Sequence, residues 1–234
     1  MQRFTLAAPA GRSLPTDAVS YGADVPREDE LRLLGPVDGK RVIDLGCGAG
    51  HNAIAMARQG AKVIAVDESA EQVAEARAAA EREGVKLELH HAPLAELAFV
   101  RADTVDAVVS AFGLAPVDDL DRVFRQVHRV LRPEHPFVLS LPHPAFAVTG
   151  DGPGMEVRRA YWDSAPLPGT GEGPADLPRT VSELFTSLGR ANFRVDTLLE
   201  PQPKGAPDRR GPQWSELMTY LPATLVLRAR KQGI

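Results

Sequence analysis

The chain has 234 residues, of which 44% are hydrophobic and 25% are charged, a composition that suits one soluble domain with a sizeable core. Its 27 basic and 31 acidic side chains leave a formal charge of −4, so no strong positive field would gather nucleic acid or anionic lipid. A single cysteine, Cys47, excludes an internal disulfide framework and favours a reducing compartment. No apolar run approaches the length of a bilayer span, and the first residues lack a signal-peptide pattern. We therefore expect a cytoplasmic protein with neither a membrane nor a nucleic-acid partner.

The first 25 residues are rich in Ala, Pro and Gly and show no period. Such a segment is typical of an arm that lies over a domain without joining its core. We expect residues 1–25 to form an arm or lid on a single domain that spans 1–234. Residues 27–34 then have the spacing of a short helix.

Short apolar runs alternate with helical periods from residue 41 to residue 141. Strands that are apolar on both faces and separated by helices favour a parallel sheet covered on both sides. We therefore predict an α/β fold with a doubly wound sheet. The expected strands are 41–45, 62–67, 86–90, 105–110 and 136–141, and the expected helices are 50–59, 71–84 and 118–133.

Two of these helices carry clear boundary signals. Ser69 and Gln72 form a capping box before the helix over 71–84, and Gly84 supplies its stop. The helix over 118–133 has its apolar residues on one face, with Pro133 at its end.

The regular alternation stops after residue 142. Residues 143–178 are rich in Gly and Pro and form a long insert, which we expect on the substrate side because long loops in compact domains are usually functional. A helix over 179–191 and strands over 193–201 and 219–230 follow. The segment between those two strands has no room for a packed helix, so the last strand is expected to pair as a hairpin and to run antiparallel.

A glycine-rich loop follows the first strand. Gly46, Gly48 and Gly50 allow a sharp turn and a close approach of the backbone to a ligand, and the next helix presents free N–H groups. Asp67 ends the second strand, where a carboxylate can accept hydrogen bonds from both hydroxyls of a ribose. The two elements together predict a site for a nucleoside-like ligand.

Two residues bear on which nucleoside this is. A dinucleotide fingerprint requires Gly or Ala at the position that His51 occupies, so an NAD(P)-dependent oxidoreductase is the weaker alternative. Asp44, in the last turn of the first strand, would repel a pyrophosphate but would suit an ammonium group. S-adenosylmethionine carries an ammonium group and no phosphate.

The motif VIDLGCGAG with Asp67 downstream, followed by VDAVVS, DDLDRVFRQVHRVLRP and FVLSLPHP, resembles the class I S-adenosylmethionine-dependent methyltransferases, especially the bacterial small-molecule type. The resemblance covers roughly residues 20–200. It implies a Rossmann-like seven-stranded sheet whose last strand is antiparallel, S-adenosylmethionine as cofactor, and transfer of its methyl group to O, N or C of a small organic acceptor.

The resemblance also assigns roles along the carboxyl edge of the sheet. The methionine end would lie against Asp44 and the glycines, the ribose on Asp67, and the sulfonium beside the tip of the fourth strand. The acid that many relatives use for adenine is missing, so the backbone of Pro93 and Leu94, or Glu96, would replace it. The full expected set of cofactor contacts is Tyr21, Asp44, Gly46, Cys47, Gly48, Gly50, Asp67, Glu68, Ser69, Pro93, Leu94, Ser110, Ala111 and Phe112.

The acceptor side offers one candidate base and two aromatic residues. His143 follows the fifth strand, and an imidazole titrates in the range useful for a base; the alternative is a histidine that only hydrogen-bonds the insert. Tyr161 and Trp162 are expected either to form a wall for the acceptor or to fasten the insert to the core. The strand tips lack the carboxylates that would hold Mg²⁺, so we expect no metal. A non-catalytic S-adenosylmethionine-binding protein remains the third alternative.

Overall fold

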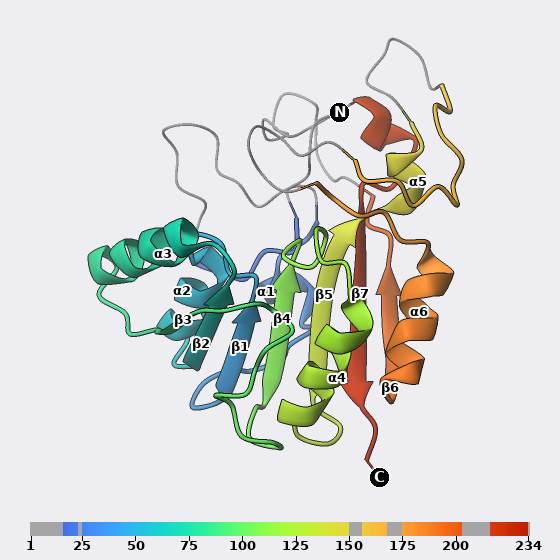
Figure 1. Ribbon diagram of the computed structural model, residues 1–234. Coiled ribbons are helices and arrows are strands. Elements are labelled where there is room, and N and C mark those ends of the chain that lie inside the picture. The colour runs from blue at the N-terminus through green and yellow to red at the C-terminus, as the bar shows by residue number, and fades with distance from the viewer. Residues whose placement is uncertain (1–15, 23–24, 150–155, 168–174, 203–215, 234) are drawn as a thin grey trace.

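The computed structural model describes residues 16–22, 25–149, 156–167, 175–202 and 216–233. Within these residues seven strands form one mixed sheet in the order β3-β2-β1-β4-β5-β7-β6 (Figure 1). The strands are β1 (Arg41–Leu45), β2 (Lys62–Asp67), β3 (Glu88–His91), β4 (Ala107–Ala111), β5 (Pro136–Pro142), β6 (Phe193–Leu199) and β7 (Thr224–Lys231). The helices are α1 (Glu28–Leu31), α2 (His51–Arg58), α3 (Ala70–Arg82), α4 (Leu120–Val130), α5 (Pro144–Ala147) and α6 (Val181–Arg190), with a 3₁₀ turn, η2 (Glu216–Thr219).

The pairing of the strands confirms the doubly wound α/β prediction. Strands β1 to β5 are parallel to their neighbours, whereas β7 runs antiparallel between β5 and β6. The hairpin inferred for the last two strands is therefore present. Because β7 reverses direction, β6 is parallel to β5, and the carboxyl ends of six strands meet at one edge, the upper edge in Figure 1. Ligands of open α/β sheets bind at this edge.

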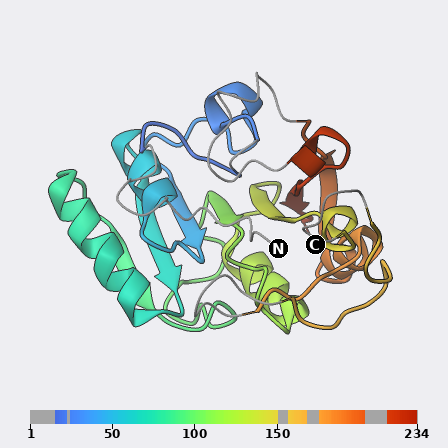
Figure 2. The ribbon, with the colours of Figure 1, turned by 90° about the horizontal axis from the view of Figure 1, so that it is seen from above.

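Helices cover both faces of the sheet. On one face, α4 contributes Val123 and Phe124 and α6 contributes Leu188 to a buried apolar cluster with the central strands. The rings of Phe124 and Phe137 meet edge to face, with centroids 5.8 Å apart. On the other face, α2 packs Ala53 and Met56 into a second cluster. The view down onto the carboxyl edge separates α3 at one end of the sheet from α5 and η2 at the other (Figure 2).

The N-terminal arm departs from the sequence prediction. Val19 and Tyr21 are buried within the second core cluster, so this part of the arm belongs to the core and does not simply lie over it. Two reciprocal hydrogen bonds of 2.9 Å hold it there, from the Ser20 amide to Asn52 Oδ1 and from Asn52 Nδ2 to the Ser20 carbonyl. Residues 1–15 lie outside the described residues.

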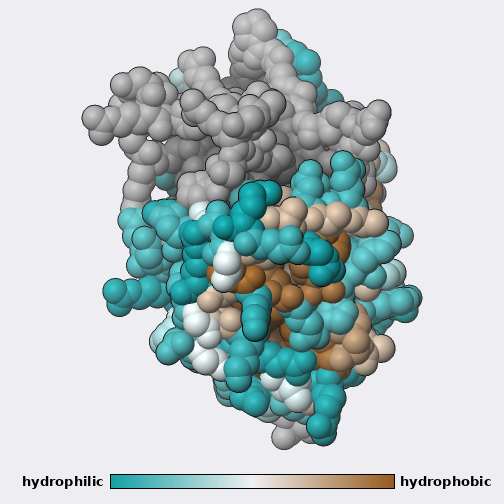
Figure 3. All heavy atoms as spheres, turned by 90° about the vertical axis from the view of Figure 1, so that its left-hand side faces the viewer, coloured by the Kyte–Doolittle hydropathy of each residue, from teal (hydrophilic) through white to brown (hydrophobic). Residues whose placement is uncertain are grey.

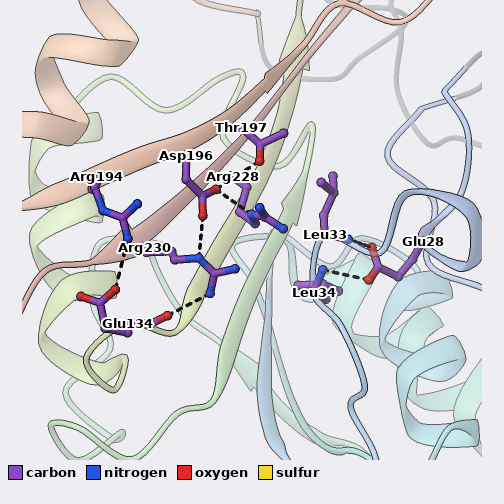
Figure 4. A network of polar contacts seen from close by, with 9 residues as sticks. All are labelled: Glu28, Leu33, Leu34, Glu134, Arg194, Asp196, Thr197, Arg228 and Arg230. Atoms are coloured by element: carbon purple, nitrogen blue, oxygen red, sulfur yellow. Dashed lines mark hydrogen bonds and ion pairs between the residues drawn. The ribbon is translucent and has the colours of Figure 1, made fainter.

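A buried carboxylate fixes the turn that follows the arm. Glu28 accepts hydrogen bonds from the hydroxyl of Tyr21 (2.6 Å) and from the amides of Leu33, Leu34 and Gly35 (2.8–3.0 Å). Figure 4 shows the Leu33 and Leu34 amides directed at the two carboxylate oxygens. These bonds turn the chain after Leu31, and α1 is therefore shorter than the predicted 27–34.

Other element boundaries differ from the predictions at their ends. The last strand begins at Thr224, five residues later than predicted, because η2 and the turn at Tyr220 occupy the preceding segment. The insert over 143–178 contains α5, which its irregular composition did not indicate. Its residues 150–155 and 168–174, and most of the loop over 201–214, lie outside the described residues.

The sheet ends at β3 on the side that also carries α3. Figure 3 shows hydrophobic residues reaching the surface in the middle of this face, within a surround of hydrophilic ones. Phe99, 39% exposed, stacks on His90 with a centroid distance of 3.9 Å. The opposite edge strand, β6, carries ion pairs on one face: Asp196 pairs with Arg228 and Arg230, and Arg194 pairs with Glu134 (Figure 4).

Candidate functional site at the carboxyl edge

The glycine loop of β1 packs against the tip of β4. Gly46 has a φ of 75°, and a Cβ atom there would lie 2.6 Å from the Cα of Gly113. The amides of Gly46 and Cys47 both donate to the Val66 carbonyl at 2.8 and 3.0 Å, which ties the loop to β2. The loop therefore needs glycine at position 46 both for its backbone conformation and for the close contact with β4.

Asp44 is the buried acid of the loop. It lies near the carboxyl end of β1, and only 2% of the residue is exposed. The Ala53 amide of α2 donates a hydrogen bond to its side chain. Its Oδ2 atom is buried and has no hydrogen-bond partner in the described part of the chain. Burial, opposed by that amide and reinforced by nearby Asp67, raises the pKa of Asp44 to about 7. A buried carboxylate with one unpaired oxygen is suited to a cationic ligand.

Asp67 connects three segments of the site. Its Oδ2 accepts from the Gly48 amide at 2.8 Å, and its Oδ1 accepts from the Ser69 amide at 2.9 Å. Ser69 in turn caps α3, because its hydroxyl accepts from the Gln72 amide at 3.3 Å. This is one half of the predicted capping box; the Ser69 amide bonds Asp67 and not the Gln72 side chain. The charge of Asp67 helps to raise the pKa of the Asp44 carboxyl and of the Cys47 thiol. Asp67 and Asp44 therefore lie close together. Each oxygen of Asp67 keeps a second lone pair for a ligand hydroxyl.

The next turn is held by Glu68. Its Oε1 accepts from the Leu94 amide at 2.9 Å, and its carbonyl is 3.0 Å from Nε2 of His91. The Leu94 amide is therefore engaged within the protein, and Leu94 is buried, whereas Pro93 is exposed. Glu96, the other residue considered for the adenine, pairs with Arg122 at 3.3 Å. Glu68 positions the turn after β3 beside the tip of β2.

The tip of β4 is strained and buried. Phe112 has a φ of 60°, a conformation that bulky residues rarely adopt, and its amide donates to the Ser140 carbonyl of β5 at 2.9 Å. Its ring lies beside Gly22 of the arm. Ala111 is buried, and the Ser110 hydroxyl is buried without a partner in the described residues. Strain of this kind at a strand tip is typical of functional sites.

Cys47 lies in the loop between Gly46 and Gly48. Its thiol is buried and 3.6 Å from the Gly48 carbonyl. Burial, with Asp44 and Asp67 nearby, raises the pKa of the thiol, so it stays protonated and is a poor nucleophile. The structure thus favours a packing role for Cys47 within the loop. Gly50, with a φ of 84°, precedes α2 and contacts Ala76 of α3.

His143 has both ring nitrogens engaged. Its Nδ1 accepts from the Ala145 amide at 3.1 Å and so caps α5, and its Nε2 is 2.8 Å from Oε1 of Glu200. Burial lowers the pKa of His143, although Glu200 opposes this effect. The neutral ring therefore carries its proton on Nε2 and donates it to Glu200. Both contacts fit the alternative of a histidine that only hydrogen-bonds its surroundings, and the role of His143 as a base stays a prediction.

The two aromatic residues of the insert lie differently from one another. The Tyr161 hydroxyl accepts from the Val181 amide at 3.4 Å, at the first residue of α6, whereas Trp162 is 82% exposed. Their rings meet edge to face with centroids 5.9 Å apart. The hydrogen bond fits the alternative in which Tyr161 fastens the insert to the domain. Tyr21 fastens the arm to the domain, because its buried hydroxyl donates a hydrogen bond to Glu28. Burial and the nearby Glu28 raise the pKa of its phenol, so the hydroxyl stays protonated.

Sequence reasoning missed two residues of this edge. Glu200 follows β6 and pairs with His143 from 57 positions away, and no local pattern marks such a contact. Gly113 packs against Gly46, and only the dipeptide Phe112-Gly113 after an apolar run hinted at a special turn. Both residues are placed by the topology of the sheet rather than by a motif.

Comparison with known proteins agrees with this arrangement. The family model described as a methyltransferase domain matches residues 42–134. An S-adenosylmethionine dependent methyltransferase from Mesorhizobium loti, known as a crystal structure, is 29% identical, with a TM-score of 0.72 over 87% of this chain and 96% of that one. An uncharacterized protein of Haemophilus influenzae is 23% identical over 94% of this chain and 92% of its own length.

Part of the chain is also similar to enzymes of ubiquinone biosynthesis. A ubiquinone biosynthesis O-methyltransferase of Sodalis glossinidius is 38% identical over 103 residues, which are 44% of this chain and 41% of that protein. The chain thus matches only about two fifths of that relative's length.

Residues 42–134 thus match a methyltransferase domain, and the fold of the described chain is similar to that of an S-adenosylmethionine-dependent methyltransferase. Methyl transfer is the general activity, and S-adenosylmethionine the cofactor, that this similarity supports. In the described residues no helix is both long and apolar enough to cross a membrane.

Proposed function

We propose that the protein transfers a methyl group from S-adenosylmethionine to a small organic acceptor, at the carboxyl edge of a single domain, without a metal. The observation that carries the proposal is the unpaired Oδ2 atom of Asp44, buried beside the glycine loop and close to Asp67. An oxygen of this kind is costly to bury unless a ligand completes its hydrogen bonds.

The chemistry of these residues fits S-adenosylmethionine. Its ammonium group would meet Asp44, and its ribose hydroxyls would meet the remaining lone pairs of Asp67. Gly46 and Gly48 leave no side chain to hold the ligand away from the loop. Glu68, Ser69, Pro93 and Leu94 would border the nucleoside, with contacts from backbone and apolar atoms on the adenine side.

When bound, S-adenosylmethionine supplies a methyl group on a positively charged sulfur, which an in-line nucleophile can accept. The work of the protein is then to align the acceptor and exclude water. Ser110, Ala111 and Phe112 at the tip of β4 would border the reacting atoms. The buried ring of Phe112, packed against Gly22, closes this side of the site to solvent.

The oxidoreductase alternative is disfavoured by Asp44 and His51. A pyrophosphate bound at the start of α2 would meet the Asp44 carboxylate, which already accepts the Ala53 amide that such a ligand would use. The alternative of a binding protein without catalysis is separated from the proposal only by a transfer assay.

Isothermal titration calorimetry with S-adenosylhomocysteine tests the binding site. We expect the wild-type protein to bind this product and not NADH, and Asp44→Asn to weaken the affinity at least tenfold. Asp29→Asn is the matched control, because the Asp29 side chain is 63% exposed and belongs to α1. Binding of NADH, or equal affinity of the Asp44 variant and wild type, would overturn the proposal.

A further inference from the structure

We propose that Glu200 is the group that accepts the proton of the methyl acceptor, that His143 is the positioning residue that orients it, and that the acceptor is a phenol. This inference rests on the proposed function and adds to it a residue and a substrate class. It rests on the geometry of the His143–Glu200 pair and of the apolar side chains beside it.

The sheet brings Glu200 to the carboxyl edge. Glu200 follows Leu199, the last residue of β6, and β6 is parallel to β5. His143 follows Pro142, the last residue of β5. One strand, β7, lies between them, and the hydrogen bond of 2.8 Å between His143 Nε2 and Glu200 Oε1 spans it.

The backbone decides the direction of that hydrogen bond. The Ala145 amide can only donate, so His143 Nδ1 must be unprotonated to accept from it at 3.1 Å. The proton of a neutral ring is then on Nε2, which donates to Glu200. A second bond, from the His143 amide to the Ala223 carbonyl at 2.9 Å, fixes the backbone of His143. His143 is therefore a fixed donor, and Glu200 is the proton acceptor of the pair.

Glu200 is open to a ligand while His143 is not. The His143 side chain is 5% exposed and the Glu200 side chain is 51% exposed. In the described part of the chain, His143 is the one hydrogen-bond partner of Glu200, and it occupies a single carboxylate oxygen. With respect to these residues, the other oxygen can accept a hydroxyl proton.

The neighbouring side chains indicate an acceptor with an apolar, flat body. Phe112, Phe146, Met218 and Ala223 form a small buried cluster at this end of the edge. His143 contacts the cluster directly, since its carbonyl accepts from the Phe146 amide and its amide bonds Ala223. The cluster joins the His143–Glu200 pair to Phe112 at the tip of β4. Two aromatic side chains thus lie in the cluster that His143 contacts, and His143 carries the carboxylate of Glu200 on its other side. Aromatic and carboxylate groups in one neighbourhood suit a phenol, whose ring packs and whose hydroxyl donates.

The proton and the methyl group balance in this arrangement. The phenol oxygen forms a bond to the methyl carbon as the carbon–sulfur bond breaks, and the electron pair of that bond stays on sulfur. The hydroxyl proton passes to the free oxygen of Glu200 and is later lost to solvent. No other reactant is needed.

The test uses 4-nitrophenol as the probe, bound to the complex of the full-length protein with S-adenosylhomocysteine. Its phenol and phenolate forms absorb at different wavelengths, so a pH titration reports its ionisation without any methyl transfer. A carboxylate beside the hydroxyl disfavours the phenolate. We expect the apparent pKa of the bound probe to lie about one unit above that of the free probe, which is a tenfold change in its ionisation constant.

Three variants separate charge, capping and orientation. Glu200→Gln keeps an oxygen for the His143 proton but removes the charge, so the shift should disappear. His143→Gln places an amide N–H near the position of Nε2 and should keep the shift, whereas His143→Asn can still cap α5 but cannot reach Glu200 and should lose it. Phe99→Leu, on the β3 side of the sheet, is the control and should behave as wild type.

Each outcome has a definite meaning. If S-adenosylhomocysteine fails to bind wild type, the proposed function fails. If it binds but the probe does not bind or shows no shift, or if Glu200→Gln keeps the shift, the assignment of Glu200 is wrong while the proposed function stands. Loss of the shift in His143→Gln with retention in His143→Asn would show that His143 acts only as the cap of α5.

Discussion

Asp67 and Gly48 join the tips of two strands through one hydrogen bond of 2.8 Å, from the glycine amide to Oδ2 of the carboxylate. This bond fixes the glycine loop of β1 relative to the start of α3, because the other oxygen of Asp67 holds the Ser69 amide. The acid that we propose to bind the ribose thus also shapes the loop that would hold the methionine end.

Replacement of Asp67 by Asn is expected to weaken the binding of S-adenosylhomocysteine by about 2 kcal/mol, roughly thirtyfold, because charge-assisted hydrogen bonds are lost. Isothermal titration calorimetry measures the effect. Serine at the same position would leave the loop unsupported and should weaken binding further. An affinity within twofold of wild type in both variants would argue against a role of Asp67 in the site.

The stability of the ligand-free protein is expected to fall as the pH rises from about 4 to about 7. Burial raises the pKa of Asp44 to about 7 in the folded state, so in this window the folded protein holds a proton that the unfolded chain has lost. This group alone contributes a slope of about 1.4 kcal/mol per pH unit, which ends above pH 7. Asp44→Asn should remove the contribution. Urea unfolding of both proteins at several pH values measures it, and equal slopes would contradict it.

Glu28→Gln is expected to destabilise the protein by about 3 kcal/mol, since the amide group cannot accept all the donors that the carboxylate holds. Tyr21→Phe removes only one of those bonds and should cost about 1 kcal/mol. Denaturant unfolding gives both values. If the two variants were equally stable, the amides of residues 33–35 would not depend on the charge of Glu28.

Gly46→Ala and Gly35→Ala form a matched pair of substitutions. Both glycines have positive φ values, 75° and 71°, but a Cβ atom at Gly46 would lie 2.6 Å from Gly113, whereas nothing lies within 4 Å at Gly35. Gly35→Ala should cost about 1 kcal/mol from backbone strain alone. Gly46→Ala should cost about 2 kcal/mol more and displace the loop, with loss of S-adenosylhomocysteine binding. Equal thermal stability of the two variants would show that the β1 and β4 tips do not need this contact.

The strands of the sheet were predictable from local patterns. Four of the first five are short apolar runs, the third alternates, and the helix signals at Ser69 and Gly84 mark real ends. The number of strands and the cofactor were then inferred from the resemblance of VIDLGCGAG and the motifs that follow it to a known family. The antiparallel last strand followed from the shortness of the segment before it.

The parts that escaped prediction depend on contacts between distant positions. Val19 and Tyr21 lie in the core, where Asn52 holds the backbone of Ser20 between them and Glu28 holds the Tyr21 hydroxyl, and nothing in the composition of the arm signals this. Glu68 likewise binds the Leu94 amide, and Glu200 binds His143, although the partners follow different strands. These pairs can be identified only once the order of the strands in the sheet is known.

The position of β7 between β5 and β6 sets an order for assembly of the chain during synthesis. Strand β6 is synthesised before β7 (Thr224–Lys231), its one neighbour in the described sheet. The part of the sheet that holds Glu200 can therefore form only after β7 has been synthesised. A nascent chain released early would contain the glycine loop without the partner that holds His143.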